Sequence, residues 1–297
     1  MIEQPLNINT VWTNLIEDGK KPSGTELEEH ITTVHNNNAG FTETVAWKSR
    51  DVNGKNSYEL LADLIDENFH SKVLDLACGS GVLLDLCYQR FGKRIKFSGV
   101  DMNKAELNLA RQRLVHSNIK VYKSMAQNLN FIDDSSIDVV MCHWALNLMG
   151  SLEKVFGAIR RILKKEGVFG AVIEGDMNYS PSYLEVYNII YKYVRSEHPN
   201  YEKIELGDVR LKTIEGLTEI TNKTFADSDI NIKQFLLSFK ANPETLAKEV
   251  AGFFYATFVL SVSGHRRMLY DLENYFSTKK NKGISKFYMP IKFIVIK

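Results

Sequence analysis

Short apolar runs alternate with longer amphipathic stretches through the middle of the chain. The runs are rich in Val, Ile and Leu, and the stretches between them repeat apolar residues at helical spacing. Strands that alternate with helices of roughly 10–15 residues are typical of βαβ units, and strands that are apolar on both faces are buried on both sides. The pattern therefore predicts an α/β fold with a doubly wound, mostly parallel sheet. The expected strands are residues 73–77, 95–101, 119–123, 137–142 and 168–173, and the expected helices follow residue 82 and cover 104–116 and 152–163.

The segments on either side of this core have a weaker pattern. The first 56 residues are polar and contain turn signals, which predicts short helices. After Ile173 the chain becomes a tyrosine-rich helical stretch, which is followed by a strand near 233–239 and a second helical insertion. We expect an N-terminal helical lid over residues 1–56 and a core over residues 57–297, with lid insertions at about 174–232 and 243–277.

Two local features carry predictions of their own. Ser57 opens a helical pattern that runs to Phe69, with Leu60 at the position where a capping box has Glu. Pro290 lies in the apolar closing segment, residues 287–297. Because proline donates no backbone hydrogen bond, Pro290 suits a strand start or a sheet edge better than a sheet centre.

A glycine-containing turn follows the first expected strand. The sequence VLDLACGSG, Val73–Gly81, passes from an apolar strand through an acid and two glycines into a helix. Glycines adopt positive φ angles and let a ligand approach the backbone, and a helix N-terminus offers free N–H groups. Purely structural turn glycines give the same fragment, and the third glycine of the dinucleotide fingerprint is absent. The turn alone therefore does not decide between a ligand site and a plain turn.

An acid ends the second expected strand. Asp101 follows Gly81 by twenty residues, which places its carboxylate where it can accept both hydroxyls of a ribose over the glycine turn. The alternative is that Asp101 caps the next helix. Its spacing relative to Gly81 favours ribose binding.

Together these blocks resemble the class I S-adenosylmethionine-dependent methyltransferases. Within that class the chain is similar to the small-molecule group that includes ubiquinone/menaquinone-biosynthesis and malonyl-carrier-protein methyltransferases. Further matching blocks are SMAQNLNF at 124–131, DVVMCHWALNLM at 138–149 and LKKEGVFGAVIEG at 163–175, and the resemblance covers about 58–173. It implies a Rossmann-like methyltransferase fold with a seven-stranded sheet whose last strand is antiparallel. It also implies S-adenosylmethionine as cofactor and S-adenosylhomocysteine as product.

The resemblance also implies roles for individual residues. Gly79 and Gly81 would line the methionine part of the cofactor, and Asp75 would help to orient it. Asp101 would bind the ribose, and Met102 would pack on the adenine. The remaining cofactor-binding residues that it implies are Ala77, Cys78, Met125, Ala126, Gln127 and Cys142.

Two of these positions depart from the family pattern. Ala77 replaces the commonest first glycine, which slightly narrows the cofactor slot. Met125 stands where many relatives carry an acid that bonds the adenine amine. Adenine contact would therefore depend on Met102, Met125 and the backbone of Ala126 and Gln127.

Methyl transfer is an in-line displacement, so the protein mainly has to hold the acceptor near the methyl group and exclude water. A hydroxyl or protonated amine acceptor gains from a base with a pKa near the working pH. His143 is the first candidate for that base, and packing against the cofactor is the alternative. Glu174 is the second, as a base, as a partner for a cationic amine, or as a helix cap. Arg50 either pairs with the methionine carboxylate or an acidic substrate, or is an ordinary surface arginine.

Composition narrows the classes of partner. The chain has 37 Lys and Arg against 36 Asp and Glu, a formal charge of +1, so no overall field attracts nucleic acid or acidic membranes. The three cysteines form neither a disulfide framework nor a zinc motif. The N-terminus lacks the basic and apolar regions of a secretory signal, and the longest apolar run, 250–262, is shorter than the roughly 20 residues that span a bilayer. We expect a cytoplasmic protein that binds no nucleic acid, membrane or metal, and the sequence is compatible with a homodimer.

The acceptor is expected to be a small, aromatic or otherwise apolar molecule. The tyrosines that follow residue 173 and the segment GFFYATF, Gly252–Phe258, are the basis for this expectation, although core packing explains such residues equally well. A tRNA or protein methyltransferase is the alternative enzyme, and it would need a charged docking face that the composition does not indicate. A non-catalytic S-adenosylmethionine-binding subunit or a scaffold is the alternative outside the enzymes. The intact glycine turn and Asp101 argue against a scaffold, which would have no need of either.

Overall fold

A computed structural model describes residues 7–201 and 206–297, and its central element is a seven-stranded sheet with the order β3-β2-β1-β4-β5-β7-β6. The first five strands run parallel to their neighbours, whereas β5 and β7 pair antiparallel from Phe169–Ile296 to Glu174–Ile291. Asp229, before β6, and Lys297, after β7, exchange both backbone hydrogen bonds, which is the antiparallel pattern. The strands are β1 (Lys72–Leu76), β2 (Lys96–Asp101), β3 (Lys120–Lys123), β4 (Ile137–His143), β5 (Leu163–Glu174), β6 (Ile230–Ala241) and β7 (Ser285–Ile296).

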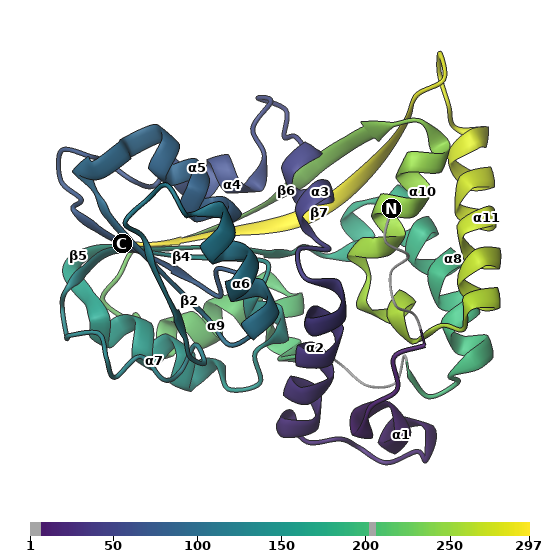
Figure 1. The fold of residues 1–297 in the computed structure, drawn as a ribbon, viewed down its shortest axis with the longest axis horizontal. Helices are drawn as coiled ribbons and strands as arrows, with labels where there is room; N and C mark the ends of the chain where they lie inside the picture. The colour runs from purple at the N-terminus through teal and green to yellow at the C-terminus, as the bar shows by residue number, and fades with distance from the viewer. Residues whose placement is uncertain (1–6, 202–205) are drawn as a thin grey trace. The chain divides into compact units, whose positions relative to one another are not determined.

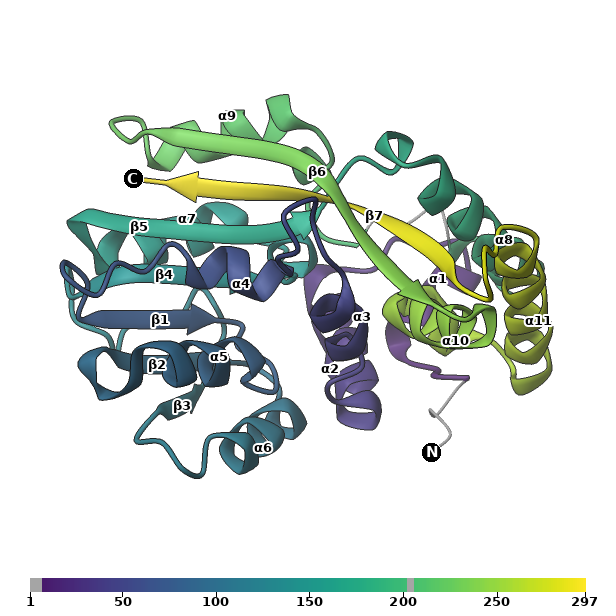
Figure 2. The ribbon, with the colours of Figure 1, turned by 90° about the horizontal axis from the view of Figure 1, so that it is seen from above.

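Helices cover both faces of this sheet. Figures 1 and 2 show α4 (Ser57–Ala62) and α5 (Val82–Phe91) on one face, and α7 (Leu152–Ile162) and α9 (Ile214–Thr224) on the other. The doubly wound, mostly parallel sheet that the sequence predicts is therefore confirmed, together with its antiparallel last strand. The other α-helices are α1 (Val11–Glu17), α2 (Gly24–Asn38), α3 (Glu43–Lys48), α6 (Lys104–Arg113), α8 (Pro181–Glu197), α10 (Pro243–Phe253) and α11 (Val262–Thr278). The 3₁₀ turns are η1 (Gly92–Arg94), η2 (Leu146–Leu148), η3 (Met177–Tyr179), η5 (Val209–Lys212) and η6 (Tyr255–Val259).

The chain forms two compact units. The first consists of the described parts of Met1–Gly54, Met177–Leu206 and Leu236–Pro290, and the second of Lys55–Asp176, Gly207–Phe235 and Ile291–Lys297. β6 and β7 each have residues in both units. The lid segments expected from the sequence include residues 1–6 and 202–205, which lie outside the described residues.

The core of the second unit fills the space between the sheet and α7 and α9. Phe169 of β5 lies 6.1 Å from the ring of Phe156 in α7, and Phe156 lies 5.9 Å from the ring of Phe225, which ends α9. All three side chains are buried within one apolar cluster. This packing holds β5 against α7 and α9.

Two local predictions were wrong. The N-cap of α4 is Asn56, which forms a capping box with Glu59, and the helix already ends at Ala62 instead of Phe69. After the helix, Leu64 packs against Gly170 of β5, where a Cβ atom would collide with it. Pro290 lies inside β7, a strand with neighbours on both sides. It is tolerated because the pairing with β5 begins at Ile291, so β5 requires no N–H at Pro290.

Within the part of the chain that the structure describes, no helix is both long and apolar enough to cross a bilayer.

Candidate cofactor and acceptor site

The turn after β1 has positive φ angles, which glycine adopts without strain. Gly79 and Gly81 have φ angles of +49° and +79°, and Ala77 also lies in the left-handed region at +58°. Gly81 is the N-cap of α5. A Cβ atom at Gly81 would lie 3.2 Å from Ala110 Cβ in α6, so this turn has both a conformational and a packing reason to be glycine.

Asp101 connects this turn to the end of β2. Its Oδ2 accepts a hydrogen bond from the Gly79 N–H at 2.8 Å, and its Oδ1 accepts one from the Asn103 N–H at 2.7 Å. The N-cap of α6 is Asn103, whose side chain accepts from the Glu106 N–H. Asp101 therefore does not cap the helix. Through its bond to Gly79 it holds the glycine turn against the end of β2.

Asp75 is a buried acid on β1 without a hydrogen-bond partner. Its side chain is 1% exposed, and neither carboxylate oxygen meets a donor in the described structure. Burial raises the pKa of Asp75 well above its usual range, and the nearby charge of Asp101 raises it further. Because buried polar groups are nearly always hydrogen-bonded, the Asp75 carboxylate marks a place where a donor belongs.

The sequence identified Asp75 and Asp101 but missed a third acid beside the turn. Glu106 is buried, and its Oε2 lies 3.7 Å from the position that a Cβ of Gly79 would occupy. The only signal in the sequence was its place in the first turn of α6, where an acid is favourable for the helix itself. Three carboxyl groups thus surround the turn, which favours a ligand that carries positive charge.

The two cysteines near the turn are buried thiols. Burial raises the pKa of both Cys78 and Cys142, and the charge of Asp75 raises both further. Both therefore stay protonated at neutral pH and contribute small apolar surface.

The loop after β3 is attached to the same edge of the sheet. The Ser124 N–H donates to the carbonyl of Asp101 at 3.0 Å, which holds Met125, Ala126 and Gln127 close to the end of β2. Met125 accepts a weak hydrogen bond from Gln127 Nε2, with a donor–sulfur distance of 3.7 Å. Like these three residues, Met102 is half-buried.

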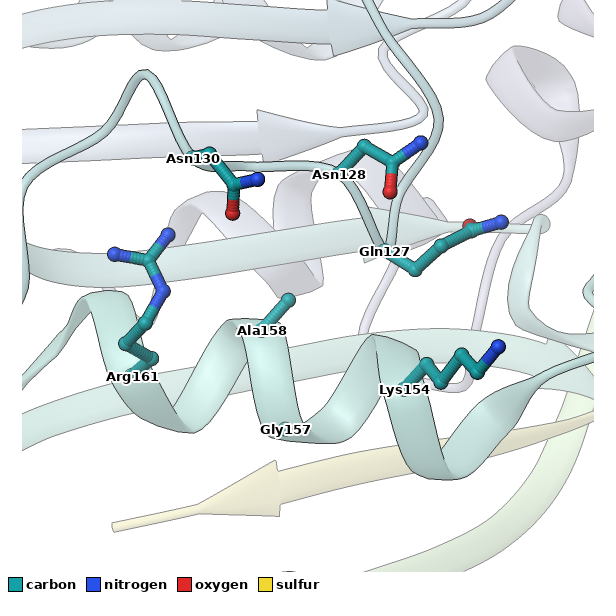
Figure 3. A pocket seen from close by; sticks show the side chains of 7 residues that line it. All are labelled: Gln127, Asn128, Asn130, Lys154, Gly157, Ala158 and Arg161. Atoms are coloured by element: carbon teal, nitrogen blue, oxygen red, sulfur yellow. The ribbon is translucent and has the colours of Figure 1, made fainter.

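A hollow of about 410 Å³ lies between this loop and α7. Figure 3 shows Gln127, Asn128 and Asn130 on the loop side and Lys154 and Arg161 on the helix side, with Gly157 and Ala158 between the two cations. Of the expected cofactor residues, Gln127 alone lines it. The Arg161 guanidinium already donates to the carbonyls of Leu129 and Ile132 and pairs with Asp134.

His143 ends β4 in an environment that keeps its ring neutral. Its Nε2 is hydrogen-bonded to Ser57 Oγ at 2.8 Å, and its ring stacks on Tyr58 with 4.0 Å between the centroids. Burial lowers the pKa of His143 to about 3, so it is a weak proton acceptor at neutral pH. Ser57 and Tyr58 were missed as site residues because the sequence assigned them only to a helix start.

Glu174 ends β5 next to a buried lysine. Lys292 is 1% exposed, and its ammonium donates to the carbonyls of Glu174 (3.3 Å), Leu211 (3.1 Å) and Lys212 (2.8 Å). Burial lowers the pKa of Lys292, although the charges of Glu174 and Asp176 oppose that shift. The N-cap of the following helix, α8, is Ser180, so Glu174 does not cap it.

Arg50 belongs to the first unit, whereas the other expected site residues belong to the second. Its backbone forms an isolated antiparallel bridge with Ser238, and its guanidinium donates to the carbonyls of Trp47 and Ser49. The structure thus brings together the glycine turn, Asp75 and Asp101, with the loop at Ser124 attached to them, and it describes Arg50 only within its own unit.

Comparison with known proteins shows that the chain is similar to methyltransferases. A family model described as a methyltransferase domain matches residues 67–204. The chain is 32% identical to the demethylmenaquinone methyltransferase of Symbiobacterium thermophilum over 101 residues, which are 33% of this chain and 40% of that protein. It is 27% identical to the ubiquinone biosynthesis O-methyltransferase of Stutzerimonas stutzeri over 209 residues, which are 62% of this chain and 88% of that protein. The alignment thus spans less than half the length of the first relative and most of the second.

A solved structure shares the fold. The phosphoethanolamine N-methyltransferase 2 of Haemonchus contortus, in complex with phosphomonomethylethanolamine and S-adenosylhomocysteine, superposes with a TM-score of 0.55 at 16% identity. The superposition covers 93% of this chain and 60% of that chain.

Proposed function

Because the chain belongs to the class I S-adenosylmethionine-dependent methyltransferases, with S-adenosylmethionine as cofactor, we propose that it methylates an O, N or C atom of a small, aromatic or otherwise apolar acceptor. The two relatives are named for demethylmenaquinone and for ubiquinone biosynthesis, and both names refer to ring compounds. The aromatic segment Gly252–Phe258 supports the same class of acceptor.

The main support for the cofactor assignment is the carboxylate of Asp75, which is buried and has no hydrogen-bond partner. It lies beside the glycine turn that Asp101 holds. An ammonium group such as that of the methionine moiety would give the buried Asp75 carboxylate the donors it lacks. Asp101, which holds the glycine turn through its bond to Gly79, would accept the ribose hydroxyls, since an ionised carboxylate has about four acceptor sites. The residues present therefore fit the cofactor in both charge and hydrogen bonding.

We assign the remaining cofactor contacts to the loops that the fold attaches to this edge. Met102 and Met125 would pack on the adenine, and the backbone of Ala126 and Gln127 would meet its edge. Ala77, Cys78, Gly79 and Gly81 would surround the methionine part, with Cys142 supplying apolar surface from β4. Arg50, in the first unit, would pair with the methionine carboxylate.

The cofactor supplies an activated methyl group on a positively charged sulfur. The chain's own residues would orient the acceptor and exclude water around it. The low pKa of His143 and its bond to Ser57 support an orienting role over proton removal. We therefore assign proton acceptance, where the acceptor requires it, to Glu174.

We further propose that the first unit provides the acceptor-binding part, as the lid segments expected from the sequence would. All three cysteines are free thiols, which is typical of a reducing compartment and supports a cytoplasmic protein. The names of the two relatives support a role in small-molecule biosynthesis.

Calorimetric titration with S-adenosylmethionine and S-adenosylhomocysteine tests the cofactor assignment, with NADH as the control ligand. We expect micromolar binding of the two sulfur compounds and no heat from NADH. Binding of NADH alone, or of none of the three, would reject the proposal. S-adenosylhomocysteine release in the presence of hydroxylated, amino-substituted and unsubstituted aromatic compounds then identifies the acceptor class.

A further inference from the structure

The hydrogen bond between His143 and Ser57 lies at the carboxyl end of β4. Nε2 of His143 is 2.8 Å from Oγ of Ser57. Ser57 has no exposed surface, whereas His143 is half-buried. Both residues belong to the second unit, as the glycine turn does. β1 and β4 pair in parallel with Leu76 beside Cys142, so His143 lies at the edge of the sheet where that turn begins.

The surroundings of the Ser57 hydroxyl determine which atom of this bond carries the proton. Among the described residues, His143 Nε2 is the sole hydrogen-bond partner of that hydroxyl. If Nε2 carried the proton and donated to Ser57, the Ser57 O–H would be buried without an acceptor. Buried donors without partners are rare and cost free energy, so the Ser57 O–H donates to Nε2. A neutral imidazole carries one proton, which then lies on Nδ1.

This protonated Nδ1 is available to a ligand. It has no hydrogen-bond partner among the described residues, and it is not one of the side-chain atoms that are closed off from solvent. Nε2 of His30, in the first unit, also has no partner, but it is completely buried. No ligand reaches that atom without local unfolding. Nδ1 of His143 therefore differs from a structural histidine nitrogen, because it is an accessible donor beside the glycine turn.

Three features fix the direction of this donor. The first is the bond to Ser57, and the second is the stacking of the His143 ring on Tyr58, with 4.0 Å between the centroids and 27° between the planes. The third is the backbone of Trp144, which has a φ of +54° and donates its N–H to the Val172 carbonyl at 2.8 Å. A non-glycine residue keeps such a conformation only where the surrounding structure imposes it. The His143 ring is thus held in one orientation, as a group that orients a reactant must be.

We propose that Ser57 is a positioning residue that keeps His143 in the Nδ1–H tautomer, and that His143 in this form donates a hydrogen bond to a lone pair of the methyl acceptor. The proposal rests on the proposed function, in which His143 orients the acceptor, and it states how that orientation is achieved. It also makes the site selective. An acceptor group with a lone pair matches the Nδ1–H, whereas an ammonium group, which only donates, does not.

Nitrogen-15 NMR of the labelled full-length protein at pH 7 tests the tautomer, because the chemical shift of each ring nitrogen shows whether it carries a proton. We expect the proton of His143 on Nδ1. His70 is the internal reference, since its Nδ1 accepts from the Asp66 N–H at 3.0 Å, which leaves the proton on Nε2. The spectrum of His143→Gln assigns the His143 signals by their loss. A proton on Nε2 of His143, or an equal mixture of the two tautomers, would overturn the proposal.

Variants of Ser57 test its positioning role. In Ser57→Ala the ratio of the Nε2–H form to the Nδ1–H form of His143 should rise at least tenfold, and Ser57→Thr, which keeps a hydroxyl, should restore the wild-type ratio. Ser136→Ala is the matched control, because Ser136 lies in the same unit and donates to the Asp133 carbonyl at 2.7 Å. It should leave the ratio unchanged. A wild-type ratio in a folded Ser57→Ala protein would reject the role of Ser57, and if circular dichroism shows this variant to be unfolded, the wild-type spectrum decides.

Kinetics with an acceptor from the aromatic panel measure the effect of the donor. Ser57→Ala should raise the KM of the acceptor at least fivefold, while the dissociation constant of S-adenosylhomocysteine changes less than twofold. A wild-type KM despite a shifted tautomer would overturn the donor role of His143. Absence of S-adenosylhomocysteine binding to the wild-type protein rejects the cofactor assignment, whereas intact binding with the proton on Nε2 rejects only this inference.

Discussion

The carboxylate of Asp101 accepts a hydrogen bond from the backbone N–H of Gly79 at 2.8 Å. The acid that ends β2 therefore fixes the turn that follows β1, and one side chain connects the two strand ends where the cofactor is expected.

Replacing Asp101 should weaken cofactor binding. In Asp101→Ala both charge-assisted bonds to the backbone and the proposed bonds to the ribose are lost, which corresponds to roughly 1.5–3 kcal/mol. We expect the dissociation constant of S-adenosylhomocysteine, measured by calorimetry, to rise by at least tenfold. Asp85→Asn, in α5, is the control and should leave it unchanged. An Asp101→Ala protein with wild-type affinity would show that the ribose binds elsewhere.

Asp75 should make the ligand-free protein less stable as the pH rises. Its folded-state pKa is raised, so the folded state holds a proton that the unfolded state releases above about pH 4. Stability is then lost as the pH rises from that value towards the raised pKa. Asp75→Asn should reduce this loss and also weaken S-adenosylhomocysteine binding.

Urea unfolding between pH 4 and pH 8, with and without S-adenosylhomocysteine, measures the Asp75 effect. If the free energies of unfolding of the wild type and Asp75→Asn have the same pH dependence, then Asp75 is ionised and satisfied by a donor in the ligand-free protein.

The glycine turn should tolerate no side chain at Gly81. Gly81→Ala carries the strain of a left-handed residue, roughly 1–2 kcal/mol, and also crowds Ala110 and Leu114. Gly283→Ala is a matched control, because Gly283 has the same φ of +79° but open space around its missing Cβ. Thermal unfolding should show the larger decrease in Tm for Gly81→Ala. Equal decreases would mean that α6 moves aside without cost.

His30 should make the protein sensitive to acid. Burial lowers its pKa from 6.5 to about 4 in the folded state, so the unfolded state binds the proton first as the pH falls. Stability is complete above pH 6.5 and is lost down to pH 4, by about 3 kcal/mol at roughly 1.4 kcal/mol per pKa unit. His30→Phe keeps a ring to stack on Trp12 and removes the titration. Its free energy of unfolding should vary less than that of the wild type between pH 7 and pH 5, and an equal variation would assign the acid sensitivity to other groups.

The sequence predicted the parts of the fold that depend on local pattern. Runs such as IDVVMC identify buried parallel strands by composition alone, and VLDLACGSG identifies the turn because glycine is required there. The N-cap of α4 could not be predicted from the sequence, because Asn56 and Ser57 are both good N-cap residues. The position of Pro290 depended on where pairing with β5 begins.

The parts of the site that depend on contacts between residues far apart in the chain could not be predicted from the sequence. Nothing near Ser57 or Tyr58 indicates that both contact His143, 86 residues from Ser57. The sequence around Ser57 and Tyr58 has no motif, so a role for them can be recognised only from their contact in the folded structure.

The chemical reactivity of Lys292 can report local opening of the sheet, because this lysine is buried. The ammonium group of Lys292 donates three hydrogen bonds to carbonyls and has almost no exposed surface. Lys292 should therefore react much more slowly with amine reagents than the exposed lysines do. Its acetylation rate would therefore measure how often β7 separates from β5 and η5. Mass spectrometry of a single peptide could then follow, without any substrate, how often the second unit exposes the interior of its sheet.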